Sequence, residues 1–118
     1  MATERIALME AMALAPGEVK RCLAPGFAPF AVYNIDGDYF VTEDICSHGM
    51  ASLSEGTLDG DIIECPWHGG AFHVRTGAAA ERPCVAPIKT FPAIVEDGMI
   101  WTEAAPKAAG SLKQEPYL

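Results

Sequence analysis

Two short segments of the chain each combine one cysteine with one histidine. The first runs from Cys46 to His48 and the second from Cys65 to His68, and sixteen residues separate His48 from Cys65. The full pattern is C-x-H-x16-C-x2-H. Thiolate sulfur and imidazole nitrogen are ligands that both zinc sites and iron–sulfur clusters take from proteins. The spacing therefore predicts a metal centre assembled from two loops, with two ligands on each loop.

The way in which the ligands are shared between the loops distinguishes the candidate metals. Common zinc motifs pair like with like, placing two cysteines or two histidines close together. Here each loop carries one of each kind, which suits a cluster with two inequivalent irons, one bound by both cysteines and the other by both histidines. That is the ligand set of a Rieske [2Fe–2S] centre. A zinc-structured interaction module stays open as the alternative, and it would be colourless and contain no iron.

The chain is acidic, and its charges are unevenly distributed. Eight Lys and Arg residues against 16 Asp and Glu residues give a net charge of −8, which argues against nucleic-acid binding. No Lys or Arg occurs between Arg21 and Arg75, a stretch that holds eight acidic residues. This stretch is either an ordinary solvated surface or a docking face for a basic partner.

Turn signals indicate the elements that must position the two loops. Asp-Gly pairs occur at Asp36, Asp59 and Asp97. Asp-Gly between apolar runs favours a β-hairpin, because both central residues of a type I′ turn need positive φ. We expect strands at about 19–23, 30–35, 39–42, 62–65, 71–74, 88–91, 94–96 and 99–102. Short strands at this spacing predict a single all-β domain, an antiparallel sandwich or incomplete barrel.

The two ends of the 118-residue chain differ in composition. Residues 4–14 have a helical composition that Pro16 and Gly17 end, so one or two helical turns are expected there. Residues from about 104 to 118 are rich in Ala, Pro and Lys and are expected to form a loosely held tail. No apolar run reaches 18 residues, and Glu10 interrupts the apolar N-terminal segment. We therefore expect no membrane helix and no secretory signal, and a cytoplasmic location.

The two-loop motif resembles that of the small Rieske-type ferredoxins of bacterial aromatic-ring-hydroxylating dioxygenase systems. The resemblance covers about residues 19–102, and its motifs are C-S-H-G-M-A from Cys46, L-S-E-G from Leu53, C-P-W-H-G-G-A-F from Cys65 and V-R-T-G from Val74. It implies a Rieske domain in which a small cluster-binding subdomain, about residues 44–85, is inserted. It also implies one [2Fe–2S] cluster, ligated by Cys46, His48, Cys65 and His68.

Differences within the broader Rieske family predict the reduction potential. Respiratory Rieske proteins carry an extra cysteine in each loop, joined as a disulfide, and a serine in the second loop that donates a hydrogen bond to a cluster sulfide. Ala51, Trp67 and Gly70 stand at the corresponding positions of this sequence. Because such hydrogen bonds favour the reduced form, their absence predicts a potential near the lower end of the Rieske range, about −150 mV.

The resemblance also implies how electrons enter and leave. His48 and His68 would lie at the exposed tip as the electron port, with Met50 and Trp67 in an apolar collar and Pro83 in a third covering loop. The implied donor is a flavin-dependent, NAD(P)H-oxidising ferredoxin reductase. The implied acceptor is the Rieske centre of a terminal oxygenase α subunit, and members of the family are usually monomers.

The other residues offer no second reactive centre. A mononuclear iron site would need two further histidines and a carboxylate, and only His73 is left, so the protein is expected to carry electrons rather than to oxidise a substrate. His73 is expected to face solvent beside a core-facing Phe72. Cys22 and Cys84 are interpreted as buried thiols; a disulfide between them is the alternative, and the expected cytoplasmic location argues against it. A ferredoxin that serves another redox system and a redox-sensing regulator are further alternatives, although a regulator would need an additional binding segment.

Overall fold

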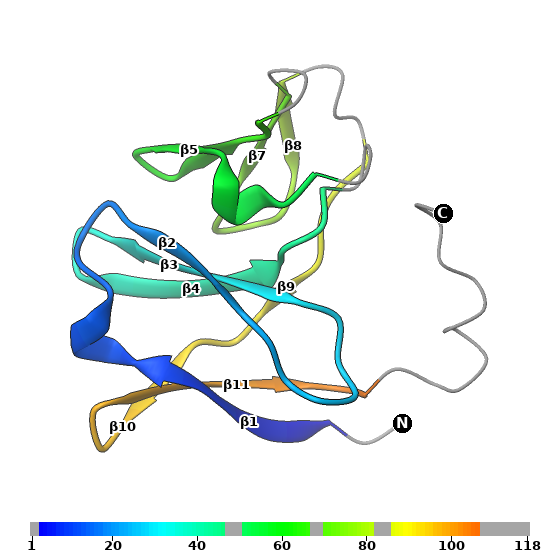
Figure 1. Ribbon diagram of the computed structural model, residues 1–118. Helices are drawn as coiled ribbons and strands as arrows, with labels where there is room; N and C mark the ends of the chain where they lie inside the picture. The colour runs from blue at the N-terminus through cyan, green and yellow to red at the C-terminus, as the bar shows by residue number, and fades with distance from the viewer. Residues whose placement is uncertain (1–2, 47–50, 67–69, 82–85, 107–118) are drawn as a thin grey trace.

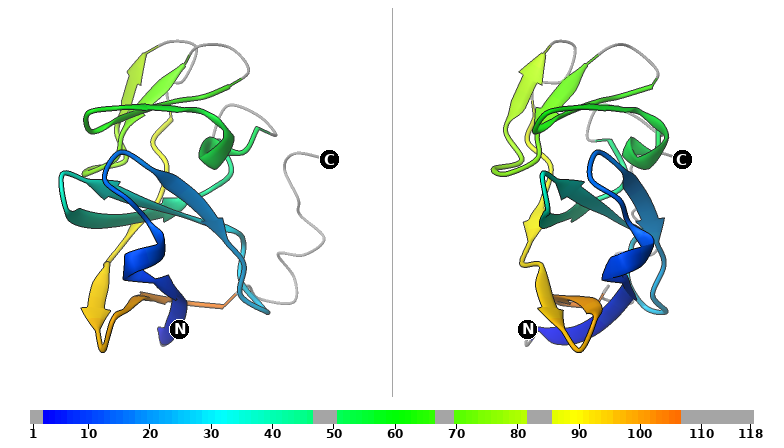
Figure 2. Two further views of the ribbon diagram at one scale, coloured as in Figure 1. Left: turned by 60° about the vertical axis from the view of Figure 1, so that its left-hand side comes forward. Right: turned by 90° about the vertical axis from the view of Figure 1, so that its left-hand side faces the viewer.

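The computed structural model describes residues 3–46, 51–66, 70–81 and 86–106. This part of the chain forms three antiparallel sheets that lie in tiers (Figure 1), and the two further views show the same order of tiers (Figure 2). The upper sheet has the strand order β5-β6-β7-β8, the middle sheet β2-β3-β4-β9 and the lower sheet β1-β11-β10. The predicted all-β fold is therefore confirmed.

The elements are β1 (Glu4–Glu10), η1 (Ala11–Ala13), β2 (Val19–Cys22), β3 (Phe30–Ile35), β4 (Asp38–Glu43), η2 (Leu53–Glu55), β5 (Thr57–Asp59), β6 (Ile62–Glu64), β7 (Ala71–His73), β8 (Ala79–Glu81), β9 (Thr90–Phe91), β10 (Ile94–Glu96) and β11 (Met99–Ala104). Both η elements are single turns of 3-10 helix.

Strand β3 joins the two cores of the molecule because it is buried on both faces. Every residue of this strand is buried. Successive side chains of a strand point to opposite faces. Tyr33 and Ile35 accordingly pack into the core that the middle sheet shares with the upper sheet. Phe30 and Val32 pack into the core that it shares with the lower sheet. The middle sheet thus supports a layer on each side.

The predicted Asp-Gly hairpins are present, with one difference in turn geometry. The first and third pairs have positive φ at both residues and close the β3–β4 and β10–β11 hairpins. Between β5 and β6, Asp59 pairs with Ile62, so the two turn residues are Gly60 and Asp61. Only Gly60 of these two has a positive φ, 62°. A glycine in the first turn position makes this hairpin type II′ rather than type I′.

The chain forms the upper sheet between β4 and β9, which are neighbouring strands of the middle sheet. β4 pairs with β9, and Val41 lies opposite Phe91. The Glu43 N–H donates to the Lys89 carbonyl oxygen at 3.0 Å, and the Lys89 N–H donates to Glu43 Oε2 at 2.7 Å. The chain therefore leaves the middle sheet and returns to it at adjacent residues, and the intervening segment forms η2 and the upper sheet.

The N-terminal segment is a strand, which corrects the helical expectation for residues 4–14. β1 pairs with β11 along its length, and only the short turn η1 follows it. Ile6, Leu8 and Met9 pack against the core above the lower sheet. Pairing with β11 and burial of these side chains outweigh helix propensity, which differs among ordinary residues by less than about 0.7 kcal/mol each.

Two other differences concern two short strands of the upper sheet and the C-terminal end of β11. β5 and β8 have no counterpart among the predicted strands, because their sequences, Thr-Leu-Asp and Ala-Ala-Glu, carry no run of β-branched or aromatic apolar residues. β11 continues to Ala104, which is buried, so the predicted tail begins within a strand, and residues 107–118 lie outside the described part. No helix in the described residues is long and apolar enough to cross a membrane.

Candidate metal centre

The first cysteine motif begins a loop just beyond the end of β4. Ile45 and Ser52 form an isolated β-bridge across the base of this loop. Inside the bridge, the Cys46 N–H donates to the Ala51 carbonyl oxygen at 3.0 Å. This hydrogen bond closes a loop of four residues, 47–50.

The second cysteine motif begins a loop directly after β6. The Cys65 N–H donates to the Gly70 carbonyl oxygen at 2.6 Å, which again closes a loop of four residues, 66–69. Outside this bond β6 and β7 form a regular antiparallel ladder in which Glu64 lies opposite Ala71. The two loops therefore have the same length, and the same backbone hydrogen bond closes each of them at its cysteine.

Both cysteines lie in apolar surroundings. Cys46 is 2% exposed and Cys65 is 3% exposed. Both belong to the core between the middle and upper sheets, together with Leu53, Ile63 and Phe72. Water competes poorly for a metal in such a core, and soft thiolate ligands suit iron–sulfur clusters and zinc. The donor set thus fits the predicted cluster, since two equal loops bring two thiols into one apolar core.

The remaining predicted site residues are not part of the described structure. They are His48, Met50, Trp67, His68 and Pro83. The four-residue ligand set and the electron-transfer surface therefore stay predictions from the sequence.

Phe72, His73 and Cys22, none of which is a predicted ligand, are placed as the sequence predicts. Phe72 is fully buried and its neighbour His73 is exposed, which confirms the predicted orientation of β7. Cys22 is buried, and burial raises the pKa of its thiol above the ordinary value. It therefore acts as a small apolar residue of the lower core. Cys84 lies outside the described residues.

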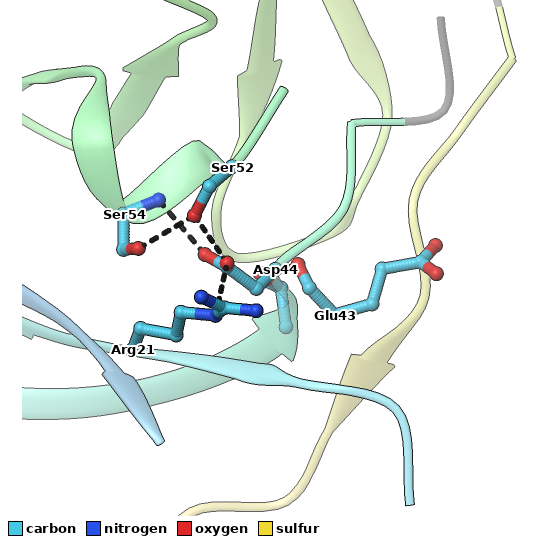
Figure 3. Close-up of polar contacts among 6 residues, drawn as sticks. Arg21, Glu43, Asp44, Ser52 and Ser54 are labelled. Atoms are coloured by element: carbon cyan, nitrogen blue, oxygen red, sulfur yellow. Dashed lines mark hydrogen bonds and ion pairs between the residues drawn. The ribbon is translucent and has the colours of Figure 1, made fainter. Parts of the chain in front are cut away.

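Motif analysis missed one charged residue next to the first loop. Asp44 is fully buried two residues before Cys46. Its carboxylate accepts hydrogen bonds from Ser52 and Ser54 and is paired with Arg21 (Figure 3). The signal that could have revealed it is an acidic residue at the end of an apolar strand, directly before a cysteine motif and followed by two closely spaced serines.

Two glycines permit close backbone approaches beside the loops. A Cβ atom on Gly56 would lie 1.9 Å from the Glu64 carbonyl oxygen, so the backbone between η2 and β5 lies directly against the end of β6. A Cβ atom on Gly77 would lie 2.2 Å from the Ile88 carbonyl oxygen. Gly77 also has a φ of 81°, a region that favours glycine. Both approaches connect a segment of the upper sheet to the chain that flanks it.

A tiered all-β scaffold with two equal cysteine loops at one core fits an iron–sulfur electron carrier. The chain belongs to the Rieske [2Fe–2S] domain family, whose model matches residues 4–92. As a member of this family it binds a Rieske [2Fe–2S] cluster, and the zinc-structured alternative is not retained.

Proteins that are similar to this chain in sequence are ferredoxins. Ferredoxin CarAc of Metapseudomonas resinovorans is 50% identical over 92 residues, which are 78% of this chain and 86% of that protein. The ferredoxin component of the p-cumate 2,3-dioxygenase system of Pseudomonas putida is 44% identical over 102 residues, 86% of each chain. These identities confirm the resemblance to ferredoxin components and identify an electron carrier rather than an enzyme.

Solved structures agree with this assignment. The ferredoxin of Sphingomonas yanoikuyae B1 matches with a TM-score of 0.83 and 42% identity, over 86% of this chain and 100% of that chain. A chain in the complex of reduced oxygenase and oxidized ferredoxin in carbazole 1,9a-dioxygenase matches with a TM-score of 0.82 and 45% identity. That match covers 88% of this chain and 96% of the other.

Proposed function

We propose that this protein is the ferredoxin component of an aromatic-ring-hydroxylating dioxygenase system. It takes single electrons from a flavin-dependent, NAD(P)H-oxidising ferredoxin reductase and passes them to the Rieske centre of a terminal oxygenase α subunit. The observation that carries this proposal is the pair of equal loops that present Cys46 and Cys65 to one apolar core. The names of its relatives, ferredoxin components of p-cumate and biphenyl dioxygenase systems, support the choice of partners.

The proposed ligands divide between the two irons by chemical type. The thiolates of Cys46 and Cys65 bind one iron, and the imidazoles of His48 and His68 bind the other. When bound, the [2Fe–2S] group supplies a reversible one-electron step. The chain contributes an apolar core that keeps water from both thiolates and backbone hydrogen bonds that hold each cysteine at the start of its loop.

The proposed docking surface is the tip that carries the histidine ligands. His48 and His68 form the electron port, and Met50, Trp67 and Pro83 supply apolar contact around it. A small apolar surface favours brief encounters over permanent association, so we expect a monomer that exchanges partners rapidly. Because NAD(P)H is the source of electrons, we also propose a cytoplasmic location.

The first test is spectroscopic. Absorbance and EPR spectra are recorded before and after dithionite, with iron and sulfide measured on the same sample. We expect two irons and two sulfides per chain and a reduced signal with an average g of about 1.91, which reflects histidine ligation of the reducible iron. A sample reconstituted with iron and sulfide that forms no such cluster would contradict the proposal.

A second test addresses the partners. The purified protein replaces the ferredoxin in a reconstituted carbazole 1,9a-dioxygenase reaction, and NADH consumption is followed together with product formation. Turnover that depends on added protein supports the proposed role. Rapid reduction by the reductase without any transfer to the oxygenase would instead favour a ferredoxin that serves another redox system.

A further inference from the structure

The two cysteine loops differ in how their bases are held. The second loop stands on a ladder of three residue pairs, in which Ile62, Ile63 and Glu64 lie opposite residues of β7. Among the residues that the structure describes, the first loop has only the isolated bridge between Ile45 and Ser52. The backbone pairing at the base of the first loop is therefore shorter than at the base of the second.

Asp44 supplies interactions across the base of the first loop. Its Oδ1 accepts a hydrogen bond from the Ser54 N–H at 2.9 Å, and its Oδ2 accepts one from the Ser52 hydroxyl. The bond from the Leu53 N–H to the Asp44 carbonyl oxygen, 2.7 Å, belongs to the bridge itself. Two residues that follow the loop, Ser52 and Ser54, are thus bonded to the carboxylate of one residue that precedes it (Figure 3).

Asp44 is also fixed to the middle sheet. Its N–H donates to the Pro29 carbonyl oxygen at 3.0 Å. The Arg21 Nε on β2 lies 3.4 Å from Asp44 Oδ2, and this arginine is half-exposed whereas the carboxylate is fully buried. A buried carboxylate is costly unless it is paired and hydrogen-bonded, and here both oxygens have partners. The base of the loop is therefore anchored to the scaffold as well as closed on itself.

We propose that Asp44 is a positioning residue for the cluster. Its carboxylate adds bonds to Ser52 and Ser54 beyond the single bridge, and through these bonds it fixes the base of the first loop and the backbone at Cys46, the ligand that starts this loop. The inference rests on the proposed ligands Cys46 and His48, and it adds a residue that acts through the two serines.

The test compares two aspartate variants in the cluster-loaded protein. Asp44→Asn removes the buried carboxylate, and Asp61→Asn is the matched control. Asp61 is also paired with an arginine, Arg75, at 3.2 Å, but both side chains are about half-exposed and their pair closes no loop. We expect cluster loss to an iron chelator to become several-fold faster in Asp44→Asn and to stay at the wild-type rate in Asp61→Asn.

A spectroscopic measurement separates positioning from general stability. The reduced protein should show two histidine nitrogen couplings by pulsed EPR, one from each loop. Because Asp44 holds only the first loop, Asp44→Asn should change one coupling and broaden the signal, while the second coupling stays as in the wild type. A variant that unfolds more easily but keeps both couplings and the wild-type rate of cluster loss would overturn the inference.

Ser52→Ala keeps the test decisive if Asp44→Asn does not fold. This variant removes one hydrogen bond to the carboxylate and leaves the bond from the Ser54 N–H in place. The same changes, smaller in size, support the inference, and wild-type behaviour overturns it. Failure of the proposed function is recognised separately, because the wild-type protein would then show no Rieske signal at all.

Discussion

The guanidinium of Arg75 lies over the ring of Phe40, with its Cζ 4.8 Å from the ring centroid. Arg75 follows β7 in the upper part of the molecule, whereas Phe40 belongs to β4 of the middle sheet. The same guanidinium pairs with Asp61 through a 3.2 Å contact between Nε and Oδ2. One side chain therefore connects the turn of the β5–β6 hairpin to the scaffold below it.

Replacing Arg75 should weaken this connection by a measurable amount. A half-exposed cation over an aromatic ring contributes about 0.5–1 kcal/mol, and an exposed ion pair contributes up to about 1 kcal/mol. We expect Arg75→Ala to lower the free energy of unfolding by about 1 kcal/mol, and Asp61→Asn by less. Urea denaturation at low and high salt separates the contribution of the ion pair from that of the ring contact, since salt weakens the ion pair but leaves the ring contact. Equal losses in both variants would contradict a role for Phe40.

Three glycine-to-alanine variants separate steric crowding from backbone conformation. Gly77 is crowded and has positive φ, Gly56 is crowded without positive φ, and Gly37 has a φ of 94° in open space. We expect Gly37→Ala to cost about 1–2 kcal/mol, the price of a left-handed conformation. Gly56→Ala and Gly77→Ala should each cost about 3 kcal/mol or more, because a backbone oxygen must move. Chemical denaturation measures all three, and similar losses throughout would show that the close approaches relax easily.

Cys65 and Cys22 provide a matched pair for testing the ligand assignment. Both are buried cysteines, but only Cys65 starts one of the two loops. Cys65→Ser should lose the cluster, with iron content falling to near zero and the visible absorbance disappearing. Cys22→Ser should keep the iron and the spectrum of the wild type while losing some stability. Iron analysis of both variants decides this, and loss of iron in Cys22→Ser alone would place the centre elsewhere.

The buried hydroxyl of Tyr33 is expected to make the free energy of unfolding fall at alkaline pH. Burial is the main cause that raises the pKa of its hydroxyl well above the ordinary value of 10.0, although the 2.8 Å hydrogen bond with Thr42 opposes part of this rise. Above about pH 10 the unfolded chain loses this proton while the folded chain keeps it, so the free energy of unfolding falls as the pH rises.

Tyr33→Phe should change both the level and the slope of this dependence. At neutral pH we expect a loss of about 1 kcal/mol from the missing hydrogen bond. Between about pH 9 and pH 11 the variant should lose less stability than the wild type, because one proton no longer separates the folded and unfolded states. Denaturation at several pH values measures the slope, and parallel curves for the two proteins would refute this account.

Local signals made much of the fold predictable. β3 follows from a nearly continuous apolar run and the β10–β11 hairpin from its Asp-Gly turn, and both signals depend only on neighbours in the sequence. β1 could not be predicted in this way, since Glu4 pairs with Ala104 near the other end of the described chain. The composition of that segment favours a helix when it is considered alone, and only the distant strand makes it extended.

The same distinction holds for the metal centre. The loops that begin at Cys46 and Cys65 could be predicted because ligand type and spacing are local properties of the sequence. The acidic residue Asp44 and the two serines that follow form a local signal, but its burial and its contacts with Arg21 and Pro29 depend on parts of the chain that the fold alone brings to it. No short motif contains the full set of these residues.

The chain leaves and re-enters the middle sheet at Glu43 and Lys89, which makes the half that carries Cys46 and Cys65 a unit that can be grafted. Its two ends are already joined by one backbone hydrogen bond and by the bond from the Lys89 N–H to the Glu43 carboxylate, so a chimaera cut at these positions needs no new linker. The surface that donor and recipient must share is one face of β3, where Ala31, Tyr33 and Ile35 meet the upper core. Redox properties can therefore be exchanged between such proteins as one block, while the remaining scaffold is left as it is.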